Sequence, residues 1–191
     1  MHPHTDDKQT RILDAAAVLF AGRPFHKVLL SDVAQSASVG KGTLYLYFAS
    51  KEELYLAVLF REFAGLVDRL RARIDREGAP AGEQMADAVR EIVRHLFNKT
   101  VLVELLRGAV VNCPKTGEWN DKRLELRDLI EAVIRRGIAQ GVFQDEHPRL
   151  SAQYIPGMIR SVCLFLPEGT DEETVCAHAC DFVLRALRPT R

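Results

Sequence analysis

Apolar residues recur at the three- and four-residue spacing of an α-helix along nearly the whole chain. Prolines and glycines fall mainly between these periodic stretches, and no alternating pattern of useful length for a β-strand interrupts them. The sequence therefore predicts an all-α protein. We expect three short helices over residues 7–21, 30–36 and 41–47, followed by a larger bundle of six helices.

The ends of the later helices are marked by capping signals. Ser50 followed by Glu53 predicts a capping box that opens a long fourth helix, and Thr170 with Glu173 predicts a second box before the ninth. Gly141 is the expected C-terminal cap of the seventh helix. The sixth helix, over residues 100–112, is apolar nearly all round, which predicts a place in the middle of the bundle.

Composition excludes several classes of protein. The 191 residues carry 26 basic and 26 acidic side chains, and no apolar run is long enough to span a membrane. The first residues lack the apolar core of a secretory signal, and four cysteines without regular spacing make no disulfide framework. We therefore expect a reduced, soluble, cytoplasmic protein without a membrane partner.

Catalytic and metal-binding patterns are absent from the sequence. It contains no nucleophile elbow, HExxH, P-loop or GxGxxG motif, so we expect neither an enzyme nor a cofactor. Cys176, His178 and Cys180 lie close together in sequence. Because residues two apart point to nearly opposite sides of a helix, His178 cannot join both thiols, and we predict no metal site.

Residues 30–48 have the size and turn length of a helix-turn-helix. Residues 22–51 also carry four basic side chains against one acidic one, although the whole chain is neutral. In such motifs the second helix enters the major groove, where hydroxyl and methyl groups contact base edges while cations and phenols contact phosphates. The predicted DNA-contacting residues of this motif are Lys41, Gly42, Thr43, Tyr45, Tyr47 and Lys51. Exposed lysines and tyrosines on short helices occur in many other helical proteins, so this pattern alone leaves the function open.

Three consecutive segments carry a more specific resemblance: RILDAAAVLF at residues 11–20, DVAQSASVG at 32–40 and KGTLYLYFASKEELYLAV at 41–58. Together they resemble the N-terminal domain of the TetR family of bacterial transcriptional regulators. The chain departs from the family pattern at Pro24, where Gly is common, and at Leu29, where Thr or Ser is common. It departs again in the turn, where Ala37-Ser38-Val39-Gly40 replaces the usual Ala-Gly-Val-Ser. Because Leu29 has no hydroxyl, the resemblance implies that Ser31 makes a phosphate contact instead, as a seventh DNA-contacting residue.

The resemblance implies a DNA-binding domain over residues 7–67 and a regulatory and dimerisation domain over residues 68–191. It further implies a homodimer that binds a double-stranded, near-palindromic operator and is released from it by a small molecule. Repression is the expected mode of action. Two alternatives remain open: a DNA-binding protein of the same fold without an effector, and a helical binding or thiol-sensing protein that does not use DNA.

The apolar stripes of the C-terminal helices predict where a partner subunit and an effector would bind. The stripes of the last two helices are wider than one-sided packing needs, which favours a two-fold four-helix interface. Its predicted residues are Ile155, Ile159, Val162, Phe182 and Val183. A mostly apolar pocket for a small hydrophobic effector is predicted from Phe97, Leu102, Leu106, Arg107, Trp119, Tyr154 and Met158.

Overall fold

A computed structural model of the chain describes residues 3–74, 78–97 and 117–189, with side chains from Asp7 onward. The described segments contain helices, turns and loops and no strand, so the predicted all-α class is confirmed. The predicted sixth helix, with its effector candidates Leu102, Leu106 and Arg107, lies outside the described residues.

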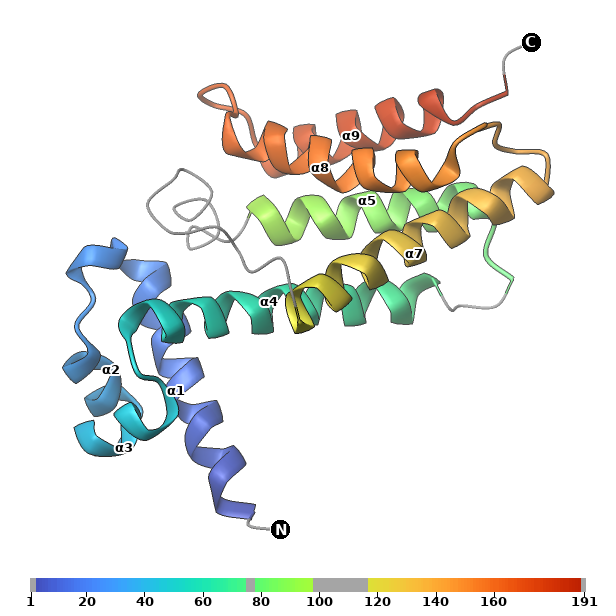
Figure 1. Cartoon of the computed structure of the whole chain (residues 1–191). Coiled ribbons are helices and arrows are strands. Elements are labelled where there is room, and N and C mark those ends of the chain that lie inside the picture. Colours follow the sequence, from blue (N-terminus) through green and yellow to red (C-terminus); the bar gives the residue numbers. More distant parts are fainter. Residues whose placement is uncertain (1–2, 75–77, 98–116, 190–191) are drawn as a thin grey trace. The chain divides into compact units, whose positions relative to one another are not determined.

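The helix boundaries follow the sequence pattern closely. Both short helices of the predicted helix-turn-helix begin and end at the predicted residues. The elements are α1 (Pro3–Gly22), the 3-10 turn η1 (Phe25–Lys27), α2 (Leu30–Ser36), α3 (Lys41–Tyr47), α4 (Lys51–Ile74), α5 (Ala81–Phe97), α7 (Glu118–Ala139), α8 (Pro148–Leu164) and α9 (Glu172–Ala186). They appear with these labels in Figure 1.

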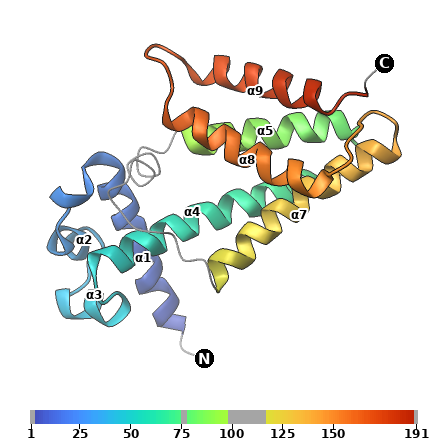
Figure 2. The ribbon, with the colours of Figure 1, turned by 45° about the horizontal axis from the view of Figure 1, so that its top comes forward.

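The described chain divides into two compact units within α4, between Glu62 and Phe63. The sequence predicts a domain boundary after Val67, which lies in the same helix. In the first unit α1, α2 and α3 gather at the N-terminal part of α4 (Figure 1). In the second unit α5 lies among α7, α8 and α9 and contacts all three (Figure 2).

An aromatic cluster anchors the first unit. The buried ring of Tyr55 on α4 lies 4.7 Å from Phe20 of α1 and 4.9 Å from Phe25 of η1, measured between ring centroids. The 3-10 turn that carries Phe25 begins after Pro24, which has a φ of −53°. The chain thus closes this connection without the Gly that the family pattern has there, as proline requires.

Helix α5 is buried around most of its circumference, and it carries polar groups where it meets α4. Its Glu91 carboxylate accepts a 2.6 Å hydrogen bond from Nε of Arg69 and lies 3.0 Å from a guanidinium nitrogen of Arg73. Its buried Gln84 amide donates to the carbonyl of Ile74 and accepts a hydrogen bond from Arg136 on α7. These bonds satisfy polar groups that would otherwise destabilise the apolar core.

The predicted caps are confirmed at two of three helix ends. Ser50 Oγ accepts from the backbone N–H of Glu53 at 3.0 Å, and the Glu53 carboxylate accepts from Ala49 N–H at 2.8 Å. Gly141 has a φ of +72° and ends α7 in a Schellman motif, with Val142 N–H bonded to Gly137 O at 2.9 Å.

The capping box predicted for the last helix is wrong. Asp171, not Thr170, is the N-cap of α9, and its Oδ1 accepts from the backbone N–H of Thr174 at 2.8 Å. The Thr170 hydroxyl donates instead to the carbonyl of Pro167. The hydrogen bond from Thr174 holds the pKa of the Asp171 carboxyl below its ordinary value.

A substitution at Gly137 tests how tightly Phe143 packs on α7, next to the Schellman motif that ends this helix at Gly141. The buried ring of Phe143 folds back on the helix so closely that a Cβ on Gly137 would lie 2.6 Å from Phe143 Cγ. We predict that Gly137→Ala lowers the free energy of unfolding by about 1–3 kcal/mol, the usual cost of overpacking. Thermal or urea unfolding measures this change.

The matched control is Gly82→Ala on α5, where a Cβ meets nothing within 4 Å. Because alanine favours helix, this variant should be as stable as the parent or more stable, by up to about 1 kcal/mol. Equal stabilities of the two alanine variants would contradict the tight packing of Phe143 on α7.

Candidate nucleic-acid interface

The turn between α2 and α3 is held by backbone hydrogen bonds. Val39 N–H bonds to Ala34 O at 3.0 Å, and Ser38 N–H bonds to Gln35 O at 3.1 Å. Ser38 has a φ of +53° and is the one non-glycine residue with positive φ in the described segments. It stands where the family pattern has Gly, so this chain makes the same left-handed turn with a less favourable residue.

Helix α3 has an inner and an outer face. Leu44 and Phe48, four residues apart, are buried with 0% and 3% of their surface exposed. Helical spacing puts Gly42 and Leu46 on the opposite side, and Leu46 is 86% exposed, the highest value among the exposed large hydrophobic residues. Leu46 is not among the residues predicted to contact DNA, although its offset from Leu44 and Phe48 could have identified it.

The seven residues predicted to contact DNA all lie in the first unit, on α2, α3 and the first turn of α4. Ser31, Lys41, Gly42 and Tyr45 are exposed. Thr43, Tyr47 and Lys51 are half-buried. The structure therefore brings these side chains to one unit, with α3 contributing five of them.

Lys51 is engaged within the protein. Its Nζ donates to the carbonyls of Phe25 at 3.1 Å and Val28 at 3.2 Å, and it lies 4.5 Å from the centroid of the Phe25 ring. These contacts tie the start of α4 to the η1 turn. Two of its three N–H donors are thus used in the fold, a role that its motif position did not predict.

Ser31 lies beside an acidic group. Its hydroxyl is 3.5 Å from Oδ1 of Asp32, whose other oxygen lies 3.2 Å from Arg23. Asp32 is the one acidic side chain counted for residues 22–51, and it pairs with Arg23, one of the four basic ones.

The predicted effector residues lie in different surroundings. Phe97, Trp119 and Met158 are half-buried, whereas Tyr154 is 69% exposed and therefore does not line the interior of the bundle. Trp119 stacks on Phe63 of α4 with ring centroids 6.1 Å apart, and the Arg123 guanidinium lies 5.7 Å from its ring. The Trp119 ring thus forms part of an aromatic contact between α4 and α7.

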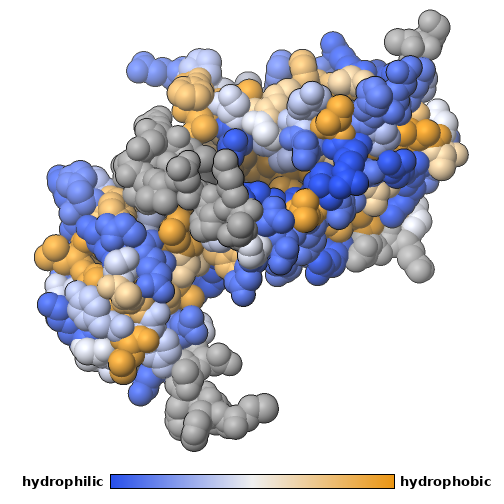
Figure 3. All heavy atoms as spheres, viewed as in Figure 1, coloured by the Kyte–Doolittle hydropathy of each residue, from blue (hydrophilic) through white to orange (hydrophobic). Residues whose placement is uncertain are grey.

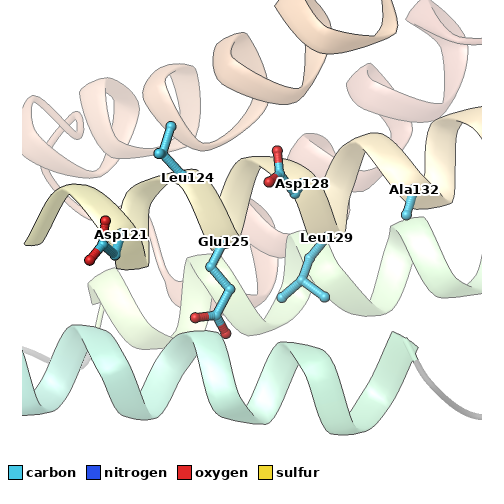
Figure 4. A pocket seen from close by; sticks show the side chains of 6 residues that line it. All are labelled: Asp121, Leu124, Glu125, Asp128, Leu129 and Ala132. Atoms are coloured by element: carbon cyan, nitrogen blue, oxygen red, sulfur yellow. The ribbon is translucent and has the colours of Figure 1, made fainter. Parts of the chain in front are cut away.

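An open groove of about 470 Å³ runs along α7. Its lining residues are Asp121, Leu124, Glu125, Asp128, Leu129 and Ala132. Figure 4 shows Glu125 directed toward α4 and Leu124 on the other side of α7. Glu125 pairs with Arg71 and, at 3.2 Å, with Lys122, which also bonds Asp68. Of the predicted effector residues that the structure describes, Phe97, Trp119, Tyr154 and Met158, none lines this groove.

The residues predicted for a dimer interface divide into two groups. Ile155, Ile159 and Val183 are 6%, 2% and 2% exposed, so their side chains pack inside the protomer and offer no surface to a second chain. The protomer's own packing thus covers these three side chains, and the dimer interface stays a prediction. Val162 and Phe182 are 48% and 51% exposed.

Three cysteines lie in the α8–α9 region. Burial raises the pKa values of the Cys163, Cys176 and Cys180 thiols above the ordinary value. Their thiols are therefore protonated at neutral pH, which disfavours the reactive thiolates that thiol sensing needs.

In the described part of the chain no three His, Cys, Asp or Glu side chains are placed to hold a metal ion. None of the described helices combines the length and hydropathy of a membrane span.

Comparison with known proteins identifies the family. Residues 12–58 match the model for "Bacterial regulatory proteins, tetR family", and residues 78–187 match the model for "Tetracyclin repressor-like, C-terminal domain". The chain belongs to the TetR family. TetR-family proteins are DNA-binding transcriptional regulators and not enzymes, so α2 and α3 are the helix-turn-helix of a regulator.

Individual relatives agree with this assignment. The chain is 30% identical to the HTH-type transcriptional repressor KstR of Mycobacterium tuberculosis over 71% of its length and 60% of that protein. It is 26% identical to the fatty acid metabolism regulator protein of Bacillus subtilis over 80% of its length and 79% of that protein. The crystal structure of FadR from Bacillus subtilis with stearoyl-CoA matches its fold with a TM-score of 0.74, covering 94% of this chain and 99% of that one at 21% identity.

The two lysines of the interface should respond differently to substitution. We predict that Lys51→Ala lowers the free energy of unfolding by about 1–3 kcal/mol, because two charge-assisted hydrogen bonds to carbonyls are lost. Lys41→Ala should leave the free energy of unfolding unchanged. In a plot of the logarithm of the DNA-binding constant against the logarithm of the salt concentration, it should reduce the steepness of the slope by about one, as for one lost phosphate contact. Urea unfolding and binding titrations at several salt concentrations measure both effects.

If Lys51→Ala is as stable as the parent protein, the contacts of Lys51 with the two carbonyls contribute little to the free energy of unfolding. If Lys41→Ala leaves the salt dependence of DNA affinity unchanged, Lys41 does not contact a phosphate in the interface.

A substitution at Gly42 should have opposite effects on the stability of the domain and on its affinity for DNA. A Cβ on Gly42 meets nothing within 4 Å in the protein. We predict that Gly42→Ala stabilises the domain by about 0.5–1 kcal/mol, because alanine favours helix. The same change should weaken operator binding by about 1–3 kcal/mol, since the new methyl group holds α3 away from the base edges. Fluorescence anisotropy with labelled operator measures the affinity, and undiminished binding would show that this face of α3 does not approach DNA.

Proposed function

We propose that this TetR-family protein is a homodimeric repressor that places one α3 helix of each subunit in successive major grooves of a near-palindromic operator. The observation that carries the proposal is the division of α3 into two faces. Leu44 and Phe48 anchor the helix in its domain, while Lys41, Gly42 and Tyr45 remain exposed. Such a helix presents backbone, cation and phenol groups to DNA at little cost in rearrangement. We expect the protein to act in the cytoplasm, where bacterial DNA lies.

Repression requires that the operator overlap a promoter, and this can be tested on genomic DNA. Fragments of the source genome bound by the purified protein should share a near-palindromic sequence whose half-sites are about one helical turn apart or slightly more. Transcription from the adjacent promoter should fall when the protein is added in vitro. Binding without any effect on transcription, or activation, would contradict the proposed repression.

Exposed apolar side chains on α8 and α9 support a homodimer. Three of them share one face of α8 at helical spacing, a fourth directly follows that helix, and α9 contributes one more. We call these five residues the α8–α9 stripe: Leu150, Tyr154, Val162, Phe165 and Phe182, which are 47%, 69%, 48%, 79% and 51% exposed. Figure 3 shows apolar side chains among polar ones over this part of the surface. Contact with a second copy would remove these groups from water, which is the usual reason for such a stripe.

We further propose that an apolar effector releases the DNA. Relatives from Bacillus subtilis supply the chemical class: the sequence match is named for fatty acid metabolism, and the structure of FadR holds stearoyl-CoA. Helix α4 is continuous from the helix-turn-helix unit into the second unit, so it connects the two along the chain. Lowering operator occupancy from 99% to 1% needs a difference of about 5.5 kcal/mol in ligand affinity between the two states, which two bound ligands share.

The effector-free alternative keeps the same fold and the same DNA contacts. The open groove on α7 offers a ligand a place in the second unit, which favours the ligand-responsive protein over this alternative.

The homodimer proposal predicts the outcome of one charge substitution. Phe182→Asp should give monomers, because an unpaired carboxylate would be buried at the centre of the interface. Affinity for the palindromic operator should fall with it, since each monomer holds only one half-site. Val142→Asp, at a residue 45% exposed and outside the α8–α9 stripe, is the matched control and should remain dimeric. Sedimentation velocity distinguishes the species, and an intact Phe182→Asp dimer would move the interface elsewhere.

The effector proposal predicts a spectroscopic change at the single tryptophan. Titration with stearoyl-CoA, or with another long apolar compound, should change Trp119 fluorescence and release labelled operator over the same concentration range. Coenzyme A without an acyl chain is the matched control and should do neither. If no apolar compound in a broad panel changes either signal, the effector-free alternative replaces this proposal.

A further inference from the structure

Leu46 is an apolar side chain exposed to solvent on the outer face of α3. It lies in the last turn of α3, directly opposite the buried Leu44 and Phe48, and 86% of its surface is accessible. Single exposed leucines are common on protein surfaces. This one is notable because its neighbours on the outer part of α3 are the exposed Lys41, Gly42 and Tyr45, which belong to the proposed DNA interface.

Gly42 lies one helical turn before Leu46 and has no side chain that could cover it. Side chains on an α-helix lean toward its N-terminus, so the patch that Leu46 covers lies over the turn containing Gly42. Gly42 has no side chain, and nothing else lies within 4 Å of the place where its Cβ would be. Leu46 and Gly42 together therefore make a shallow apolar surface. Figure 3 shows apolar side chains mixed with polar ones on the face of the first unit in view.

The major groove offers one apolar group to such a surface. Base edges present hydrogen-bond donors and acceptors there, and only thymine adds a methyl group, at C5. A leucine gains nothing from a phosphate or from a polar base edge, since neither replaces the water that it loses. We propose that Leu46 packs against the C5-methyl group of a thymine in each operator half-site and thereby selects thymine at that position. This inference rests on the proposed function, because it assumes that α3 lies in the major groove.

The test begins with operators selected by the protein itself. The full-length protein and its Leu46→Ala variant are each used to select bound sequences from a random duplex library. The parent should enrich thymine at one position of each half-site, and Leu46→Ala should lose that preference while keeping the others. The variant should fold normally, because the exposed side chain contributes no core contacts, and its thermal unfolding checks this.

Replacing that thymine by uracil removes only the methyl group. The parent protein should bind the uracil operator about fourfold more weakly for each half-site, and about 15-fold more weakly for both, as expected for one buried methyl group per contact. Leu46→Ala should bind the thymine and uracil operators equally. Thr43→Ser is the matched control: it removes the other methyl group that α3 could offer and should leave the full thymine–uracil difference in place.

The possible failures are distinguishable. If the parent protein selects no DNA sequence, the proposed function itself fails. If it selects an operator but binds thymine and uracil equally, or if Leu46→Ala keeps the difference, the role of Leu46 is overturned while the proposed function stands. If Thr43→Ser removes the difference, Thr43 is the residue that reads the methyl group.

Discussion

The packing of α3 against the rest of its domain is the contact on which the DNA-binding surface depends. A helix of seven residues is far too short to be stable alone, since the cost of starting a helix is recovered only over a dozen or more residues. Leu44 and Phe48 supply the missing stability by burying their side chains in the first unit. Because these two residues fix the rotation of the helix about its axis, they also determine that Gly42 and Leu46 face outward.

The same unit depends on contacts that are remote in sequence. Lys51, at the first turn of α4, bonds carbonyls of residues that precede the helix-turn-helix in sequence, and Tyr55 packs against both Phe20 and Phe25. Substitutions at such residues change DNA affinity through the shape of the domain, without any contact to DNA. Loss of binding in a Lys51 variant is therefore informative only beside a measurement of stability, whereas Lys41 and Gly42 report on the interface itself.

Much of the fold could be predicted from the sequence because local signals and packing agree. The ends of α2 and α3, the Ser50 cap and the Gly141 terminus all follow from short-range patterns, and the structure confirms them. Prediction failed where two adjacent residues offered the same chemistry. Asp171 and Thr170 are both good N-caps, and only the backbone geometry of the loop decides between them.

Which side of each apolar stripe faces outward could not be predicted from the sequence. Ile155 and Ile159 point into the protomer while Tyr154 and Val162 point out, a rotation of α8 that its contacts with α5 and α7 determine. Leu46 is a different case: its offset from Leu44 and Phe48 indicates the outer face, but an apolar residue on an amphipathic helix is ordinarily assigned to the core. Lys51 shows the reverse case: a basic residue in a DNA-binding motif serves the fold because backbone carbonyls from another segment reach it.

The central claim, that α3 reads the major groove, is tested most directly by chemical protection of the selected operator with dimethyl sulfate. This reagent methylates guanine at N7 in the major groove and adenine at N3 in the minor groove. We predict that the bound protein protects guanine N7 in two clusters about one helical turn apart, or slightly more, and leaves adenine N3 between them reactive. Protection of adenine N3 with guanine N7 still reactive would place the protein in the minor groove and contradict the account.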